Sequence, residues 1–297
     1  MLRYARLRFV CQWDEAGRRL RSPLHWRNDL ENSLRRVACV LPRHKCSHCV
    51  VRDRCTYVGL FLPQEAKTVS GKSQIQMPLP FALLLPGSQE KSEVFELEVT
   101  LLEPWVSRLP YWIFALEEVG KQRSHPFTVL KGLEWTGRGW SQFYQGAQRY
   151  LEGVAVPREP IPVHLGKVAI FQWLTPGRLF KLGRPLISAS FQDLIEALVR
   201  RIENLERWYG RPEGRDYKWL VTAARDVNVE PMDLRWVESH FHSKRQNASI
   251  ALGGLMGAVI LKGDLEPFGR ILALGRDLGV GKKTALGLGR FEVAEPQ

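Results

Sequence analysis

The spacing of apolar residues between positions 191 and 209 predicts a long amphipathic helix. Its apolar positions recur at helical intervals: Phe191, Leu194, Ile195, Leu198, Ile202, Leu205 and Trp208. Ser190 and Asp193 form a capping-box pattern at its start, and Gly210 ends it. The pattern therefore predicts a helix over Phe191–Tyr209 that buries one face.

In the first half of the chain, the same kind of pattern predicts strand, helix, two strands, helix and strand. The expected elements are strand Arg3–Trp13, helix Pro23–Ala38, strands Leu79–Leu85 and Val94–Leu102, helix Trp105–Val119 and strand Phe127–Trp135. Residues 56–76 mix Gly, Pro and polar residues and predict a loop. This order of elements is that of a ferredoxin-like unit.

The second half repeats that order. Its expected elements are strand Lys167–Leu174, helix Phe191–Tyr209, strands Leu234–Phe241 and Ile250–Leu261, helix Leu265–Leu278 with Asp264 as N-cap, and strand Gly289–Val293. The polar stretch 138–162 is the predicted linker. We therefore expect an α+β protein with two tandem ferredoxin-like (βαββαβ, RRM-like) domains over residues 1–137 and 163–297.

Length and charge narrow the class of protein. A chain of 297 residues with 44% hydrophobic residues is long enough for two cores. The formal net charge of +12 favours a polyanionic partner. Residues 1–56 hold thirteen Lys and Arg against five Asp and Glu, and residues 276–290 hold four against one. Apolar runs are too short to span a membrane, so we expect no membrane partner.

Four of the five cysteines are clustered within residues 39–55, in a Cys-rich insertion of the first domain. The spacing Cys39-x6-Cys46-x2-Cys49-x5-Cys55 suits a tetrahedral structural zinc site, with an iron–sulfur cluster as the alternative for the same ligands. Buried free thiols are disfavoured because the intervening residues are polar. A total of five cysteines, an odd number, with four of them clustered, also favours a cytoplasmic location.

Two Gly-x-Gly pairs near the C-terminus predict a phosphate-binding loop over residues 279–289. Glycine lets backbone N–H groups approach an anion, and the lysines between the pairs add positive charge. The residues expected to contact a phosphate backbone are Gly279, Gly281, Lys282, Lys283, Thr284, Gly287, Gly289 and Arg290.

The two familiar nucleotide-binding loops do not fit this stretch. A Walker loop would need Gly where Arg276 stands and Ser or Thr where Lys283 stands. A dinucleotide fingerprint would need Gly at Thr284 and a helix after the loop, whereas here a helix precedes the loop and a strand follows.

The glycine loop before a last strand resembles the signature of the RAMP superfamily, specifically its CRISPR-associated endoribonucleases. Thr175-Pro-Gly-Arg178, Phe241-His-Ser243-Lys-Arg245 and Leu252-Gly253-Gly254-Leu-Met-Gly257 agree with those relatives. The resemblance implies binding of CRISPR repeat RNA or crRNA, with Lys244 and Arg245 among the phosphate contacts, and association with other CRISPR effector subunits. It also implies cleavage of precursor transcripts into guide RNAs, after which the product can stay bound.

Cleavage in the family is metal-independent, so no cofactor is expected for it. The ribose 2′-hydroxyl attacks the adjacent phosphate, which requires a base, an acid and a cation. The family's histidine usually lies near the end of the first helix. The resemblance therefore makes His25, His44 and His48 candidates, with His44 favoured because Arg43 and Lys45 flank it.

One departure from the family concerns this histidine. Relatives often carry a Gly-His-x-Leu step that aligns with Glu31-Asn32-Ser33-Leu34 here. Its absence supports an alternative, a noncatalytic RNA-binding subunit of a CRISPR ribonucleoprotein. A zinc-containing DNA-binding regulator is a third hypothesis. It is disfavoured because no helix-turn-helix or zinc-finger histidine spacing follows the cysteines.

Overall fold

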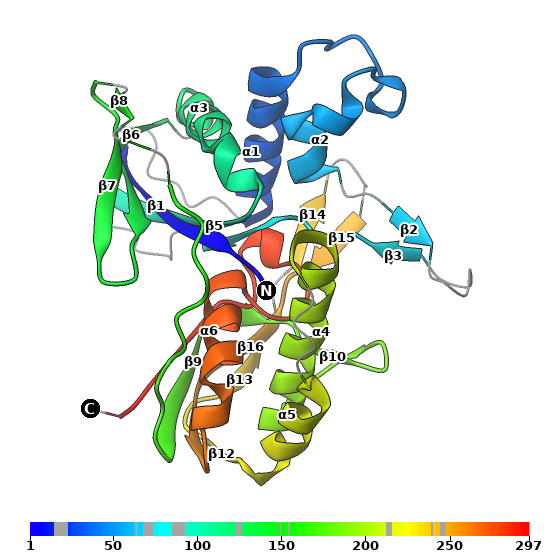
Figure 1. The fold of residues 1–297 in the computed structure, drawn as a ribbon, viewed down its shortest axis with the longest axis vertical. Helices are drawn as coiled ribbons and strands as arrows, with labels where there is room; N and C mark the ends of the chain where they lie inside the picture. The colour runs from blue at the N-terminus through cyan, green and yellow to red at the C-terminus, as the bar shows by residue number, and fades with distance from the viewer. Residues whose placement is uncertain are drawn as a thin grey trace. The chain divides into compact units, whose positions relative to one another are not determined.

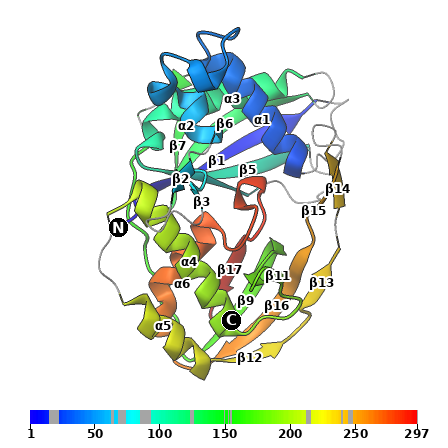
Figure 2. The ribbon, with the colours of Figure 1, turned by 90° about the vertical axis from the view of Figure 1, so that its right-hand side faces the viewer.

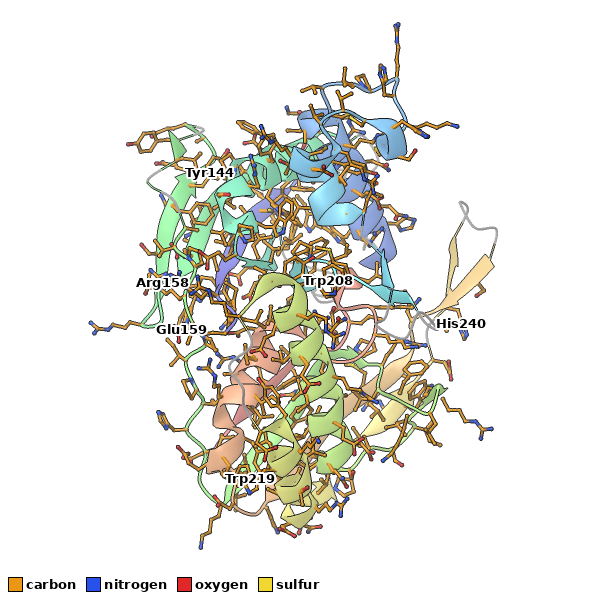
Figure 3. All side chains as sticks on the ribbon, turned by 45° about the vertical axis from the view of Figure 1, so that its right-hand side comes forward. Tyr144, Arg158, Glu159, Trp208, Trp219 and His240 are labelled. Carbon is orange, nitrogen blue, oxygen red and sulfur yellow. The ribbon has the colours of Figure 1, made fainter. Side chains whose placement is uncertain are left out.

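The computed structural model divides into two compact units, Leu2–Arg158 and Glu159–Gln297, the second of which also includes Met1 (Figure 1). We call them the N-terminal and the C-terminal unit. The residues that the structure describes are 1–14, 23–62, 65–67, 74–84, 93–122, 126–148, 150–151, 153, 155–211, 216–238, 240–243 and 248–296. Arg158 and Glu159, labelled in Figure 3, lie on either side of the division.

The N-terminal unit is built on an antiparallel sheet with the strand order β4-β5-β1-β6-β7-β8. Its strands are β1 (Tyr4–Trp13), β4 (Phe81–Leu84), β5 (Val94–Leu102), β6 (Phe127–Trp135), β7 (Trp140–Gln145) and β8 (Tyr150–Leu151). Its helices are α1 (Pro23–Ala38), α2 (Thr56–Phe61) and α3 (Leu109–Gly120), and β2 (Glu65–Lys67) and β3 (Gln74–Gln76) form a separate hairpin.

Aromatic residues fill the core of this unit. Trp26 of α1 lies 6.2 Å from Trp13, 5.7 Å from Phe95 and 5.6 Å from Phe127, measured between ring centroids. Because β1 alternates, Leu7, Phe9 and Cys11 are almost fully buried on one face of the sheet. Burial of this kind is the main favourable term in folding.

The C-terminal unit has a second antiparallel sheet, with the order β12-β16-β9-β17, and β13 also pairs with β16 (Figure 2). Its strands are β9 (Val168–Gly177), β12 (Asn228–Pro231), β13 (Arg235–Val237), β16 (Gly254–Lys262) and β17 (Phe291–Ala294). Two hairpins are β10 (Phe180–Lys181) with β11 (Arg184–Pro185), and β14 (His240–Ser243) with β15 (Ala248–Ala251). Its helices are α4 (Phe191–Tyr209), α5 (Tyr217–Ala223) and α6 (Gly269–Leu278).

The strand orders confirm the predicted fold. In each unit the first strand lies between the third and the fourth, and the second strand pairs with the third, as in a ferredoxin-like sheet. The helix predicted over Phe191–Tyr209 has those bounds, with the capping box formed. No helix in the described parts of the chain is long and apolar enough to cross a membrane.

Several local predictions differ from the structure. The expected loop 56–76 begins with α2, whose Tyr57, Leu60 and Phe61 are buried. The expected linker 138–162 contains β7 and β8, which extend the first sheet. The last helix begins at Gly269 after a 3-10 turn over Glu266–Phe268, so Asp264 is not its N-cap.

The capping box of α4 gives a test of the fold. Ser190 Oγ accepts from Asp193 N at 3.1 Å, and Asp193 Oδ2 accepts from Ser190 N at 3.1 Å. Loss of such a cap costs about 1 kcal/mol. We therefore expect Ser190→Ala to lower the melting temperature by about 2–4 °C in thermal unfolding. Ser188→Ala, at an exposed position two residues earlier, is the control. Equal melting temperatures for the two variants would contradict the role of the cap.

Candidate RNA-binding site

All four glycines of the 279–289 loop have backbone conformations that other residues rarely adopt. Their φ angles are +72° at Gly279, +81° at Gly281, +81° at Gly287 and +72° at Gly289. An L-residue with a side chain is strained there because its Cβ approaches the carbonyl oxygen. The two Gly-x-Gly pairs are therefore required by the path of the loop.

The loop closes against the Thr175-Pro-Gly-Arg178 segment at the end of β9. Lys282 N donates to Arg178 O at 3.1 Å, and Gly289 N donates to Pro176 O at 3.0 Å. A Cβ on Gly281 would come within 2.4 Å of Arg178 O. The 175–178 segment and the glycine loop, which are separate motifs in the sequence, therefore form one substructure.

Several of the loop's N–H groups are used inside the protein. Besides Lys282 and Gly289, Val280 N donates to Gly289 O at 2.9 Å. These N–H groups hold the loop together, which differs from the expectation that they converge on an anion. A phosphate bound at this loop would therefore be contacted by positively charged side chains and not by these N–H groups.

Two lysines provide this charge at the turn of the loop. Lys282 is exposed, and its Nζ lies 4.1 Å from the centroid of the Phe180 ring. Lys283 has a left-handed backbone with φ +68°. Partial burial and the nearby positive charges of Arg178 and Lys282 lower the pKa of the Lys283 ammonium group. The positive charges of Arg178, Lys282 and Lys283 therefore lie close to one another at the turn of the loop.

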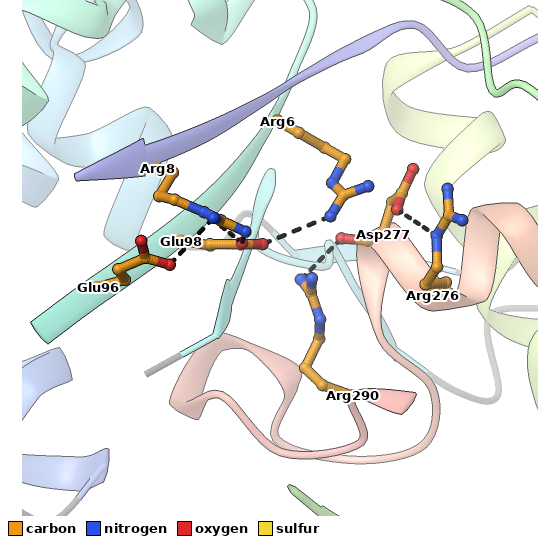
Figure 4. A network of polar contacts seen from close by, with 7 residues as sticks. All are labelled: Arg6, Arg8, Glu96, Glu98, Arg276, Asp277 and Arg290. Carbon is orange, nitrogen blue, oxygen red and sulfur yellow. Dashed lines mark hydrogen bonds and ion pairs between the residues drawn. The ribbon is translucent and has the colours of Figure 1, made fainter. Parts of the chain in front are cut away.

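Arg290 and Thr284, also predicted to contact phosphate, are buried. Arg290 is 2% exposed, and its Nη1 donates to Asp277 O at 2.9 Å (Figure 4). Thr284 is 6% exposed. In this structure Arg290 binds the C-terminal turn of α6, where a cation is favoured by the helix dipole. Lys244 and Arg245 lie outside the described residues.

The candidate catalytic side chains of the N-terminal unit are exposed but dispersed. His25 lies near the start of α1, whereas Arg43, His44 and Lys45 follow its end. The thirteen residue steps from His25 to Ala38 correspond to about 20 Å of helix. His25 and His44 therefore lie toward opposite ends of α1, and Arg43 and Lys45 are neighbours of His44 in the sequence.

His44 also lines a cavity of about 200 Å³ with all four clustered cysteines, Cys39, Cys46, Cys49 and Cys55. In the described residues no group of three or more His, Cys, Asp or Glu side chains is arranged to hold a metal ion. The fifth cysteine, Cys11, is buried in β1, and its burial raises the pKa of the thiol. All four clustered cysteines thus line this cavity, although their side chains are not arranged as a metal site.

The arginines of the first strand and helix are largely paired with acids. Arg8 Nη2 lies 2.6 Å from Glu98 Oε1, and Arg6 Nη2 lies 3.5 Å from Glu98 Oε2 (Figure 4). Arg27 Nη1 lies 2.6 Å from Glu31 Oε2. The positive charge of Arg6, Arg8 and Arg27 is therefore neutralised in part by these carboxylates.

Sequence reasoning missed the cations that surround the loop. Arg178 was singled out only as part of a motif, yet its buried guanidinium donates through Nη1 to Gly253 O. Arg200 and Arg201 lie on α4, where Arg200 Nη2 donates to Phe180 O at 3.0 Å and Arg201 Nη2 donates to Leu278 O at 2.8 Å. Only the folded chain brings these groups to the loop.

A family model matches the stretch that contains both the 175–178 segment and the glycine loop. Residues 171–291 match the family described as CRISPR-associated endoribonuclease Cas6. Over this stretch, which is less than half of the chain, the sequence is similar to the Cas6 family. A second model, described only as an N-terminal domain, matches residues 2–148. No curated protein matches the sequence.

Solved Cas6 structures share this fold over the whole chain. Thermus thermophilus Cas6 (TTHB231) is 15% identical, with a TM-score of 0.59 and 99% of each chain covered. Another Cas6 (TTHA0078), in a product complex, is 21% identical, with a TM-score of 0.55 and coverage of 99% of this chain and 100% of that one. At these identities the matches show the Cas6 fold alone.

The close approach of Gly289 to Val280 O predicts that any side chain at position 289 destabilises the loop. A Cβ there would lie 1.9 Å from Val280 O, whereas a Cβ on Gly183, with φ +79°, would meet nothing within 4 Å. Both substitutions by Ala incur backbone strain of about 1–2 kcal/mol. Gly289→Ala should lose a further ~1–3 kcal/mol through the clash.

Thermal unfolding of the full chain measures the difference between these variants. We expect Gly289→Ala to melt clearly below Gly183→Ala. If the two variants melted at the same temperature, the contact between Gly289 and Val280 would not constrain the loop.

Proposed function

We propose that this protein binds CRISPR repeat RNA, cleaves precursor transcripts into guide RNAs without a divalent metal, and retains the product. The observation that carries the proposal is the Cas6 family match over residues 171–291, which includes the cation-rich glycine loop. The RNA-bound Cas6 structures with the same fold support it. Association with other CRISPR effector subunits is part of the same proposal.

The reaction is an internal transesterification. A base removes the proton of the 2′-hydroxyl, the 2′-oxygen forms a bond to phosphorus, and the bond from phosphorus to the 5′-oxygen breaks. An acid returns a proton to the leaving 5′-oxygen, which yields a cyclic phosphate and a 5′-hydroxyl. Histidine suits the proton transfers, and a fixed cation stabilises the charge on the phosphorane.

His44 is the side chain that fits this chemistry best. It is exposed between Arg43 and Lys45, and the described residues provide no acidic partner for any of these three side chains. A phosphate could therefore meet an acid/base group and two cations on one short segment. His25 remains the second candidate, since it is also exposed on α1.

The position of the family's usual histidine is occupied by Asn32, which is exposed on α1. An amide side chain donates and accepts hydrogen bonds but does not exchange protons near neutral pH. If the enzyme uses a histidine, it must come from another position. Measurement of cleavage decides between this assignment and a noncatalytic RNA-binding subunit.

The four clustered cysteines hold a structural zinc ion in this proposal. Four thiolates are a usual zinc ligand set, and all four line the same cavity. The fit is one of ligand number and type, and binding would draw the sulfur atoms together around the metal. Zinc would stabilise the segment that carries His44 and take no part in cleavage.

Cleavage of repeat RNA tests the assignment of His44. Purified protein mixed with labelled RNA of the repeat from its neighbouring CRISPR array should cut it in EDTA, and the products should carry a cyclic phosphate and a 5′-hydroxyl. His44→Ala should reduce the single-turnover rate by about 10²–10⁴-fold, the usual contribution of a general acid or base.

His48→Ala is the matched control, because His48 is an exposed histidine of the same segment whose Nδ1 lies 3.0 Å from Ser47 Oγ. It should cut like the parent. Full activity of His44→Ala with loss in His25→Ala would move the acid/base role to α1. Tight binding without cutting by the parent would instead identify a noncatalytic RNA-binding subunit.

The metal content of the purified chain tests the zinc site. Elemental analysis should find about one zinc per molecule, as expected for a single site with four thiolate ligands. Cys49→Ser should lose it and melt at a lower temperature, whereas Cys11→Ser should retain it because Cys11 is not in the cavity. Iron with visible absorbance, or no metal in the parent, would reject the zinc site.

A further inference from the structure

A basic hollow of about 460 Å³ lies beside the glycine loop in the C-terminal unit. Its walls come from three separate segments: the β10–β11 hairpin, the middle of α4, and the turn at Gly281 and Lys282. The cations that line it are Arg178, Arg200, Arg201 and Lys282, and no Asp or Glu lines it. Its volume is in the range of small-ligand sites.

None of these four cations forms an ion pair with a carboxylate within the part of the chain that the structure describes. The charge of Glu238 acts on Arg178 and favours its protonated form. Burial lowers the pKa of Arg178, and burial together with the charge of Arg290 lowers that of Arg201 to about 10, so Arg201 stays protonated at neutral pH. Gathering positive charge with little counter-charge costs free energy, which a bound anion would recover.

Two of the cations are structural and two are accessible. Arg178 binds Gly253 O, and Arg201 binds Leu278 O, so their guanidinium groups are already engaged. Arg200 and Lys282 are exposed on the walls of the hollow. Arg200 uses Nη2 to bind Phe180 O, which leaves its other nitrogen donors for a ligand.

Two polar atoms on the wall of the hollow also lack partners. Arg178 Nε and Asn204 Oδ1 are buried and make no hydrogen bond to any described residue. Buried polar atoms without partners are rare in folded proteins and commonly indicate a water or a ligand. The two residues that line the hollow therefore keep unused hydrogen-bonding capacity next to it.

The geometry favours a phosphate over a stacked base. Lys282 Nζ lies 4.1 Å from the centroid of Phe180, and Arg178 Cζ lies 5.6 Å from it. A base could stack on this ring only by displacing a cation, whereas a phosphate near Arg200 and Lys282 would leave both cation–π contacts in place. The hollow therefore suits a backbone contact that does not depend on base identity.

We propose that this hollow binds a backbone phosphate of RNA, with Arg200 and Lys282 as the contacting residues. The inference rests on the proposed function only in taking RNA as the ligand. It adds α4 and the β10–β11 hairpin to the binding surface. It also means that the RNA is held at this point independently of its sequence.

Fluorescence anisotropy with a labelled 12-nucleotide oligouridylate tests this binding without requiring cleavage. Arg200→Gln removes the charge but retains a donor for Phe180 O. It should weaken binding about three- to tenfold at 0.1 M salt, the loss expected for one ordinary hydrogen bond. The slope of log K against log salt should become shallower by about 0.7, the value for one phosphate contact on a single strand.

Arg225→Gln is the matched control. Arg225 is an exposed arginine of the same unit that does not line the hollow, and it makes no ion pair with any described residue. It should bind oligouridylate like the parent. Lys282→Gln tests the opposite wall and should reproduce the loss, which separates the effect from any loosening of the hairpin by Arg200→Gln. Thermal unfolding verifies that each variant is folded.

Equal affinities and slopes for Arg200→Gln and Arg225→Gln would overturn the proposal. So would displacement of the RNA by a polyglutamate peptide of the same charge at the same concentration, because the hollow would then be a general site for acidic partners. Loss of oligouridylate binding in Arg200→Gln, with no repeat cleavage by the parent, would uphold the hollow and reject the nuclease. If the parent cleaves repeat RNA but neither Arg200→Gln nor Lys282→Gln weakens oligouridylate binding, the nuclease is upheld and the hollow is rejected.

Discussion

The C-terminal unit depends on the contact between the glycine loop and the end of β9. Arg178 O accepts the N–H of Lys282 and lies where a side chain on Gly281 would stand. This contact leaves no room for a Cβ, so the loop can close only with glycine. Closure fixes Lys282 next to the β10–β11 hairpin and α4, and thereby decides where positive charge gathers on the surface.

The sequence predicted elements well where they are long and periodic. Helix α4 was predicted to the residue because seven apolar positions repeat along its nineteen residues and both ends carry stop signals. Helix α2 was missed because six residues make fewer than two turns, too short for a period to show. What stabilises α2 is tertiary: Phe61 lies 5.2 Å from Phe81, in a strand twenty residues away.

For the site, the sequence identified the residues of the loop but not their roles. Arg290 is basic and adjacent to a glycine, yet it is buried against the end of α6, and only the fold determines this. The basic hollow could not be predicted, because its walls come from segments up to a hundred residues apart. His44 and the four clustered cysteines are neighbours in the sequence, and they line the same cavity in the structure. A candidate acid/base group therefore lies next to candidate metal ligands.

The left-handed backbone of Lys283 affects how mutagenesis of this loop should be interpreted. At φ +68°, alanine would keep the strain of the native lysine and remove its charge, whereas glycine would remove both. A loss seen with alanine would therefore report the missing ammonium group, because the backbone strain is the same in both residues. Comparing alanine with glycine then isolates the contribution of the backbone conformation, which an alanine scan of the loop alone would not reveal.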